Sequence, residues 1–418
     1  MAATVPSEAR FAALRHRNFT LLWSGLLVSN VGTWMQNVAQ GWVVLQLTNA
    51  PLWLGLLGLS FALPMIVLPL LSGAVVDRVH RVRLLYITQT GQMLVAFVLA
   101  ALTWLNLINV WHILIASFLS SAFLAFDNPA RQALIPDLVP RQDLLNALSL
   151  NSATYNGAAL LGPAIAGELL GPLGAGALFF INGVSFLAVL IALTAMRDVR
   201  THSHSGGPHT SSLVRSMFTG FAFAWRTRLV LALLILSALA ALFGRSYQNL
   251  LPIFARDIWQ GGEPAYGLLL SAAGGGALVG AFGVASIKHL KRQGIVLIVS
   301  GLLLSASLIA FALSPMLWLG VGLLFVVGVT STVFGTIIAT FIQVAAPNEL
   351  RGRVMSLYTI TLIGLPALGA LGTGAIAQSL GGIPGAPRAI LIAAMILGVV
   401  LLLVSPFLWR RSLATPGK

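Results

Sequence analysis

The chain has 418 residues, of which 58% are hydrophobic and only 8% charged, and its mean hydropathy is +0.93. Soluble domains carry roughly a quarter charged residues, so this composition excludes a soluble enzyme and predicts an integral membrane protein. The basic residues that give the net charge of +14 lie between apolar runs rather than along one face. This distribution indicates membrane topology and not nucleic-acid binding. Cysteine is absent, which excludes disulfides and thiolate metal sites.

The chain opens with a polar segment, residues 1–18, which we interpret as a retained tail because the apolar run behind it is longer than a signal-peptide core. Charges, prolines and glycine clusters then divide the chain into about twelve apolar runs, each near the roughly 20 residues that cross the hydrocarbon. The predicted spans are residues 19–47, 52–76, 84–104, 110–126, 144–170, 175–195, 229–252, 265–286, 294–313, 316–343, 354–379 and 389–409. We therefore predict an all-α membrane protein.

The basic residues set the predicted orientation. With this division, 21 of the 24 Lys and Arg residues lie in the tails and in the loops on one side, and the other side holds Arg245, Arg256 and Arg388. Because positive charge is retained on the cytoplasmic side, both termini are predicted to be cytoplasmic. The excess of Arg over Lys is typical of a GC-rich bacterial source, and we expect the protein in a bacterial cytoplasmic (inner) membrane.

One long polar loop, residues 197–228, divides the spans into an N-terminal half (1–196) and a C-terminal half (229–418) of six spans each. The end of this loop alternates apolar and polar residues, which fits either an amphipathic helix at the cytoplasmic interface or a plain linker. Its histidines stand in a Ser/Gly tract without a carboxylate or cysteine nearby, so no metal site is predicted.

The two halves repeat each other at a constant offset of 207 residues. The offset places Gly73 on Gly280, Pro140 on Pro347, Gly157 on Gly364, Gly162 on Gly369 and Gly167 on Gly374. Glycines at one register let helix backbones approach closely, so the repeat predicts two pseudo-symmetric six-helix halves in parallel register.

The loop after the second span, SGAVVDRVHRVRLL, resembles the signature of the major facilitator superfamily, although His80 stands where that family usually has Gly. The signature residues here are Gly73, Asp77, Arg78 and Arg81, with Arg83 adding charge one place later than usual. The resemblance implies the major facilitator fold and a conformational latch, in which Asp77 helps to hold the outward-facing state by engaging the second half. The alternative is that these charges only fix the topology.

Two further loops, FDNPARQALIPDLVPRQDLLNA after span four and QVAAPNELRGRVMS after span ten, resemble the subgroup that contains the enterobactin exporter and macrolide efflux proteins. Their charges are suited to pairs at the cytoplasmic mouth that exchange partners as the halves rock. These candidate gate charges are Asp127, Arg131, Asp137, Arg141, Glu349, Arg351 and Arg353. Ordinary solvated charge is the alternative.

Span five contains YNGAALLGPAIAGELLG, which resembles an antiporter-associated pattern through Gly157, Gly162, Pro163 and Gly167. Proline removes a backbone hydrogen bond and kinks the helix, and the glycines let the bend pack tightly. The resemblance implies export by antiport rather than import, whereas a merely structural kink is the alternative.

Polar and aromatic side chains within apolar spans are costly at membrane depth and normally face a cavity. The candidate substrate path comprises Asn30, Trp34, Gln36, Asn37 and Gln40 in span one, Asn151 and Tyr155 in span five, and Arg245, Gln248 and Asn249 in span seven. Each of these residues could instead form a helix–helix hydrogen bond.

Proton antiport needs a titratable group, and the candidates are Glu168, the only carboxylate inside a predicted span, and Asp127, at the inner end of span four. The sequence contains no GxxxxGK[ST] loop, so transport driven directly by ATP hydrolysis is not expected. It offers no catalytic triad or metal cluster, so neither a cofactor nor enzyme activity is expected. We therefore predict a monomeric secondary exporter of amphipathic small molecules such as drugs, siderophore-like metabolites or lysolipids. A nutrient importer (symporter) and a non-transporting scaffold or sensor are the alternatives.

Overall fold

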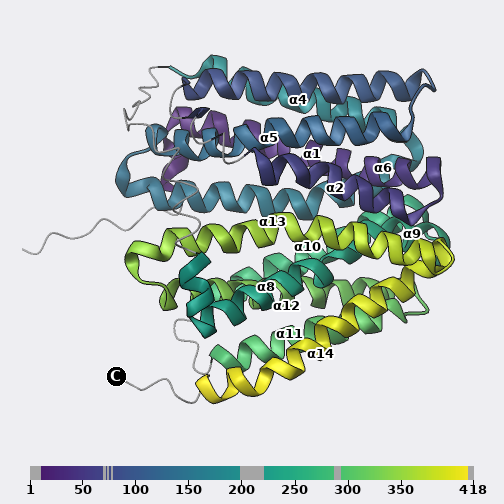
Figure 1. Cartoon of the computed structure of the whole chain (residues 1–418). Helices are drawn as coiled ribbons and strands as arrows, with labels where there is room; N and C mark the ends of the chain where they lie inside the picture. The colour runs from purple at the N-terminus through teal and green to yellow at the C-terminus, as the bar shows by residue number, and fades with distance from the viewer. Residues whose placement is uncertain are drawn as a thin grey trace, which may run out of the picture.

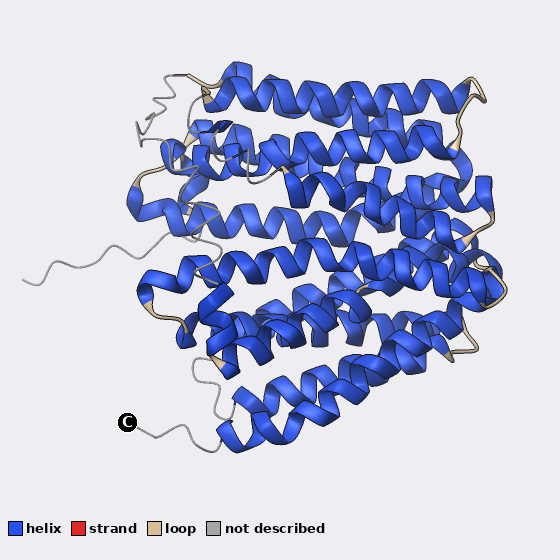
Figure 2. Ribbon diagram, viewed as in Figure 1, coloured by secondary structure: helices blue, strands red, loops and turns tan. Residues whose placement is uncertain are grey.

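The computed structural model describes residues 11–68, 72, 75–76, 79–197, 221–286 and 293–412. Within these residues all regular structure is helical (Figure 2). The long helices of the N-terminal half are α1 (Arg17–Thr48), α2 (Pro51–Val67), α4 (Arg81–Trp104), α5 (Val110–Leu138) and α6 (Leu144–Ala195). Those of the C-terminal half are α8 (Arg228–Gly244), α10 (Gly262–Ser286), α11 (Gln293–Ala312), α12 (Leu317–Ala345), α13 (Asn348–Ser379) and α14 (Ala386–Ser412).

Nine helices in the described part of the chain are long and apolar enough to cross a membrane. One of these, α6, contains two spans, because the backbone of Gly174 (φ 74°, ψ 165°) is not helical and breaks the helix. With the 32-residue α1 and the shorter apolar helix α2, the bundle reaches twelve spans. The protein is an all-α membrane protein, and the predicted boundary between spans five and six falls at the Gly174 break.

The first six spans form one block and the last six another (Figure 1). Within the first block, α1 and α4 pack against α6; within the second, α10 and α11 pack against α12. Two helix pairs make the main contacts between the blocks, α2 with α13 and α6 with α10. The two pairs are equivalent under the 207-residue offset, so the interface between the halves is itself pseudo-symmetric.

The helix bounds and the glycine contacts follow the same offset. Subtracting 207 from the bounds of α12 gives those of α5. The left-handed glycines Gly174 (φ 74°) and Gly381 (φ 107°) break the chain at equivalent places. Gly162 lies against α1, and its repeat Gly369 lies against α8, the helix equivalent to α1.

The region after span four differs from the prediction, because α5 continues to Leu138 instead of ending near residue 126. Likewise α13 begins at Asn348 rather than near residue 354, whereas α12 ends at Ala345, close to the predicted residue 343. The physical reason is that the charged residues of these segments bind one another and the backbones of neighbouring helices. Their polar groups are therefore satisfied, and the helices continue through them. In the 197–228 loop, the described residues 221–226 are helical, with the Phe221 and Trp225 rings stacked at 5.9 Å between centroids.

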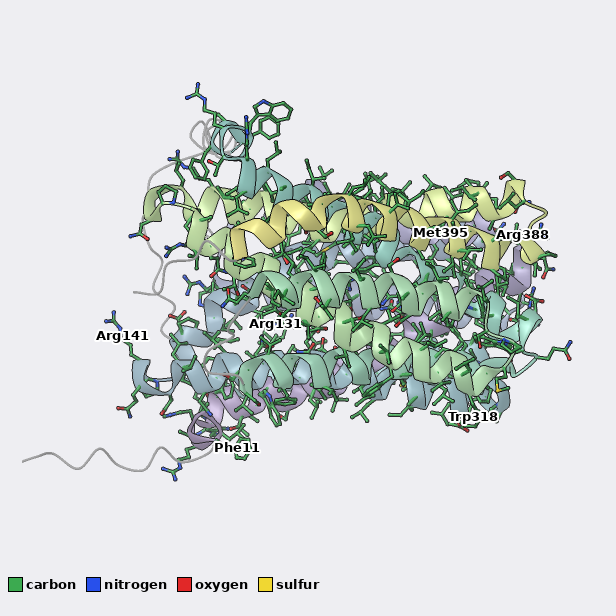
Figure 3. The ribbon with its side chains drawn as sticks, turned by 90° about the horizontal axis from the view of Figure 1, so that it is seen from below. Phe11, Arg131, Arg141, Trp318, Arg388 and Met395 are labelled. Atoms are coloured by element: carbon green, nitrogen blue, oxygen red, sulfur yellow. The ribbon has the colours of Figure 1, made fainter. Side chains whose placement is uncertain are left out.

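Figure 3 places Phe11 and Arg141 at one end of the bundle and Trp318 and Arg388 at the other. We call the first the basic end, because it carries the described cations Arg15, Arg17, Arg81, Arg83, Arg131, Arg141, Arg197, Arg226, Arg228, Arg351 and Arg353. The second, the opposite end, carries Arg256 and Arg388 among the described residues.

Candidate substrate-binding cavity

A cavity of about 520 Å³ lies between the two halves and is lined by residues of α1, α6, α8, α10, α11, α12 and α13 and of the segment that follows α8. Most of its lining consists of Gly, Ala and larger aliphatic residues. The polar and aromatic lining residues are Trp34, Tyr155, Asn156, Ser237, Arg245, Tyr247, Gln248, Ser331, Thr332, Phe334, Thr336 and Tyr358. The cavity is therefore amphipathic, with scattered polar groups on apolar walls.

An aromatic pair forms the wall on the N-terminal side. Trp34 on α1 and Tyr155 on α6 meet edge to face, with ring centroids 6.2 Å apart and an interplanar angle of 62°. Gly162 brings the two helices together, because a Cβ at this position would overlap the Trp34 side chain and lie 3.0 Å from the Val31 carbonyl oxygen. The glycine predicted as part of an antiporter pattern thus shapes the wall of the cavity.

A break in span seven forms part of the wall on the C-terminal side. Helix α8 ends at Gly244, and a 3-10 turn (Ser246–Leu250) leads to the short helix α9 (Leu251–Ile253) and a π-helical turn, Phe254–Ile258. Irregular backbone at membrane depth is tolerated where it lines a cavity or is buried in protein, and broken helices often carry transporter binding sites.

Arg245 caps the end of α8 at this break and is exposed to the cavity. Tyr247 and Tyr358 line the same cavity as Arg245. The Tyr358 hydroxyl in turn donates a hydrogen bond to the Gly335 carbonyl at 2.9 Å. No described residue forms a hydrogen bond or an ion pair with Arg245, and no Asp or Glu lines the cavity. Among the described lining residues, Arg245 is therefore the single formally charged one.

The contact between α6 and α10 closes the cavity toward the opposite end. A Cβ on Gly167 would lie 2.9 Å from the Gly267 Cα, and the Pro163 carbonyl also approaches Gly267. Next to them, Ser271 donates a hydrogen bond to the Leu160 carbonyl at 2.8 Å. The Gly-Pro segment of span five therefore provides a backbone-to-backbone contact between the halves.

Two further contacts cross between the halves at the opposite end. The rings of Trp42 on α1 and Tyr266 on α10 are stacked, 6.1 Å apart. Arg256 donates hydrogen bonds to the Asn49 side-chain oxygen at 2.7 Å and to the Leu45 carbonyl at 3.3 Å. Both contacts join α1 to the C-terminal half and add to the closure of this end.

Toward the basic end the cavity is more open. Tyr155 is 56% exposed, and Thr336, on the facing wall, is also exposed. A Cβ on Gly157 would meet no atom within 4 Å. In this conformation the cavity therefore faces the basic end.

Among the predicted gate charges, Asp127 and Arg131 form an intrahelical pair on α5, 3.8 Å apart. Asp127 is 1% exposed, and its Oδ1 accepts hydrogen bonds from Gln89 at 2.7 Å and Thr88 at 3.0 Å on α4. These contacts bury the carboxylate within the N-terminal half rather than at a mouth shared with the other half.

A second ion pair, Arg81 with Asp137, also lies within the N-terminal half, at 2.5 Å. Arg81 also donates to the Ala133 carbonyl at 2.9 Å, and thereby ties the start of α4 to the end of α5. In the C-terminal half, Arg351 donates to the Gln343 carbonyl at 2.9 Å.

The remaining predicted charges take varied positions. Arg83 and Arg141 are exposed at the basic end, and Arg353 is partly buried. The latch residues Gly73, Asp77 and Arg78 and the side chain of Glu349 lie outside the described residues. The exchange of ion-pair partners between the halves at the cytoplasmic mouth therefore stays a prediction. The conformational latch at Asp77 stays a prediction as well.

Of the predicted substrate path, Trp34, Tyr155, Arg245 and Gln248 line the cavity. The others have different surroundings. Gln36 accepts a hydrogen bond from Asn182 at 2.8 Å, Asn30 donates to the backbone of its own helix, and Asn249 lies against Gly58 of α2. Gln40 is buried, and Asn37 and Asn151 are partly buried, all three outside the cavity lining. Glu168 is exposed and is likewise not a lining residue.

The sequence prediction missed a polar face of α12. Ser331, Thr332 and Thr336 line the cavity together with Gly328, Gly335 and Ala339. Their spacing of three and four residues places them on one helix face, and this pattern of small polar residues was the signal available in the sequence. No group of His, Cys, Asp or Glu that could hold a metal occurs within the described ranges.

Twelve spans in two pseudo-symmetric halves around an amphipathic central cavity define a secondary transporter of the major facilitator type. Comparison with known proteins identifies the branch. The chain belongs to the major facilitator family described as transmembrane secretion effectors, which it matches over residues 8–412. Its relatives in this class are transporters, and the protein is an integral membrane transporter rather than an enzyme.

Three bacterial relatives resemble the chain over most of its length. The multidrug efflux pump Tap of Mycolicibacterium fortuitum is 25% identical over 91% of this chain and 94% of its own. The enterobactin exporter EntS of Shigella boydii serotype 4 is 27% identical over 96% and 94%, and the staphyloferrin A transporter of Staphylococcus aureus is 26% identical over 78% and 81%.

Solved structures share the fold. A bacterial homologue of the human lysosomal transporter Spinster superposes with a TM-score of 0.73 at 16% identity, covering 99% of both chains. The nucleoside transporter NupG also gives a TM-score of 0.73 at 16% identity, over 95% of this chain and 99% of its own.

Proposed function

We propose that the protein exports amphipathic small molecules across a bacterial cytoplasmic membrane by proton antiport and alternating access. The observation that carries this proposal is the cavity of about 520 Å³, which both halves line and which combines apolar walls with scattered polar groups. Such a surface suits a compound with an apolar body and one polar head. Rocking of the halves about this cavity would expose it alternately to the two sides.

The direction of transport is inferred from orientation and from the relatives. The basic end has the charge expected of the cytoplasmic side, so the conformation described here would load substrate from the cytoplasm. The names of two relatives, an enterobactin exporter and a multidrug efflux pump, denote outward transport by those proteins. The Gly-Pro segment of span five, by its resemblance to the antiporter pattern, supports the same direction.

Asp127 is the better of the two candidates for proton coupling. It is buried and paired with Arg131, whereas Glu168 is exposed and lies outside the cavity lining. Protonation of a buried carboxylate removes its charge and weakens its ion pair. The α4–α5 contact through Thr88 and Gln89 would then change with proton binding, and we propose this as the link between proton uptake and helix movement.

Transport by everted membrane vesicles tests the proposal, because their cytoplasmic face is outward. Energised vesicles that contain the protein should accumulate a fluorescent amphipath from a panel of drugs, siderophores and lysolipids. A protonophore should abolish the accumulation, and vesicles without the protein provide the background. Accumulation by right-side-out vesicles alone would establish import instead. Transport that persists unchanged with the protonophore would reject proton coupling.

A further inference from the structure

We infer that the cavity selects amphipaths with an anionic head, whose charge binds Arg245 while a flat apolar body lies along the aromatic and aliphatic walls. The inference rests on the proposed function, because it takes the cavity as the transport site. It narrows the substrates from amphipaths in general to carboxylates, sulfonates or phosphate esters that carry an aromatic or aliphatic body.

The charge balance of the cavity is the first support. Arg245 is the only formally charged residue among the described residues that line the cavity, and no described carboxylate neutralises it. Cations at membrane depth are costly and normally pair with another group. A guanidinium offers five N–H donors in a planar fork that matches an anionic head with two oxygens. An anionic substrate would supply the missing partner.

The backbone fixes the position of this cation. Arg245 follows the last residue of α8, where the carbonyl end of the helix dipole stabilises positive charge. The 3-10 turn Ser246–Leu250 begins directly after it, so Arg245 lies between two helical segments and not in a long loop. The side chain is therefore presented to the cavity from a defined backbone position.

The walls around Arg245 suit a flat apolar body. Trp34 and Tyr155 form the aromatic wall on one side, and Leu270, Leu304 and Leu362 contribute aliphatic surface on the other. A cationic amphipath of the same shape would find no carboxylate among the described lining residues and would be repelled by Arg245. The arrangement therefore discriminates by the sign of the head group and tolerates variation in the body.

Equilibrium binding with three probes of one shape tests the inference. Anthracene carboxylate, anthracene methanol and anthracene methylamine share a ring system and carry an anionic, neutral and cationic head at neutral pH. Binding is measured calorimetrically with the purified protein in nanodiscs of zwitterionic lipid, and empty nanodiscs correct for partition into lipid. Because no gradient is involved, this measurement is independent of transport direction and of proton coupling.

The carboxylate should bind about 10- to 100-fold more tightly than the alcohol, as expected for charge-assisted hydrogen bonds, and the amine should bind most weakly. Arg245→Gln should remove this ranking but leave binding of the alcohol within about twofold of wild type, whereas Arg245→Lys should retain part of the preference. Arg388→Gln is the matched control, because Arg388 is exposed at the opposite end and outside the cavity.

Equal affinities for the three probes, tighter binding of the amine, or a preference that survives in Arg245→Gln would overturn the inference and leave the exporter proposal standing. Absence of binding by all three probes would count against both. Conversely, the expected ranking together with failed accumulation in everted vesicles would reject the proposed export and retain anion selectivity.

Discussion

Replacing Gly167 with alanine should open the opposite end of the transporter. The added Cβ would lie 2.9 Å from the Gly267 Cα and 3.0 Å from the Glu263 carbonyl oxygen. Both neighbours are backbone atoms, so no flexible side chain can move aside. Overpacking a tight contact costs about 1–3 kcal/mol, and this cost falls on the conformation in which α6 and α10 touch here. The ratio of molecules open at the opposite end to molecules closed there should therefore rise about 5- to 150-fold.

Spin-label distances measure this shift directly. The chain has no cysteine, so introduced cysteine pairs can be labelled without background. Leu107 and Met316 are exposed at the opposite end, one on each half, and Leu145 and Val344 are exposed at the basic end. In Gly167→Ala, double electron–electron resonance should show longer distances for the first pair and shorter distances for the second.

Gly157→Ala is the control, because it makes the same change on the same helix where a Cβ would meet nothing within 4 Å. Both variants gain about 1 kcal/mol of helix propensity, so this contribution cancels between them. Unchanged distances in Gly167→Ala, or the same change in Gly157→Ala, would refute the reasoning that the glycine contact holds this end closed.

Three further substitutions test single contacts. Asp127→Asn should abolish substrate-stimulated proton flux in liposomes, because an amide cannot release a proton. Exchange of substrate between equal concentrations inside and outside the liposomes should continue. Persistent proton flux would assign coupling to another group. Arg256→Gln removes the charged donor to Asn49, and the Leu107–Met316 label pair should report a more open end, with unchanged distances contradicting a closing role. Asp137→Asn should lower the free energy of unfolding by about 1–3 kcal/mol through loss of the charged partner of Arg81, seen as a lower melting temperature in detergent; an unaltered melting temperature would exclude a stabilising role.

The sequence was sufficient to predict the twelve-span bundle, because membrane-spanning helices must satisfy their backbone internally and are therefore long apolar runs. The glycine register was equally informative. Gly162, Gly167 and Gly369 each make a close helix contact that requires the absence of a side chain. At these positions the close helix contact itself requires glycine, so the residue type in the sequence reveals the contact.

The cavity was only partly predictable, since a polar residue in a span can face a cavity or another helix. Gln36 and Trp34 are two residues apart on α1, yet the first bonds to Asn182 and the second lines the cavity. Asp127 was expected at the cytoplasmic mouth, and its burial follows from contacts with α4 that no local pattern reveals. Which face a helix turns inward depends on how its neighbours pack.

The pseudo-symmetry of the scaffold and the asymmetry of the cavity have separate physical origins. Asn49 and Arg256 are 207 residues apart, so they are equivalent positions, and their contact places them beside the pseudo-twofold axis at the closed end. The residue equivalent to Tyr155 is Leu362, which lines the cavity from the other half. The position equivalent to Arg245 is Val38, which is only 1% exposed. In the proposed alternating-access mechanism the two halves exchange closed ends, and equivalent backbone contacts serve both closed states. The inferred anionic substrate has no twofold symmetry, so it would need a charged partner on one half alone.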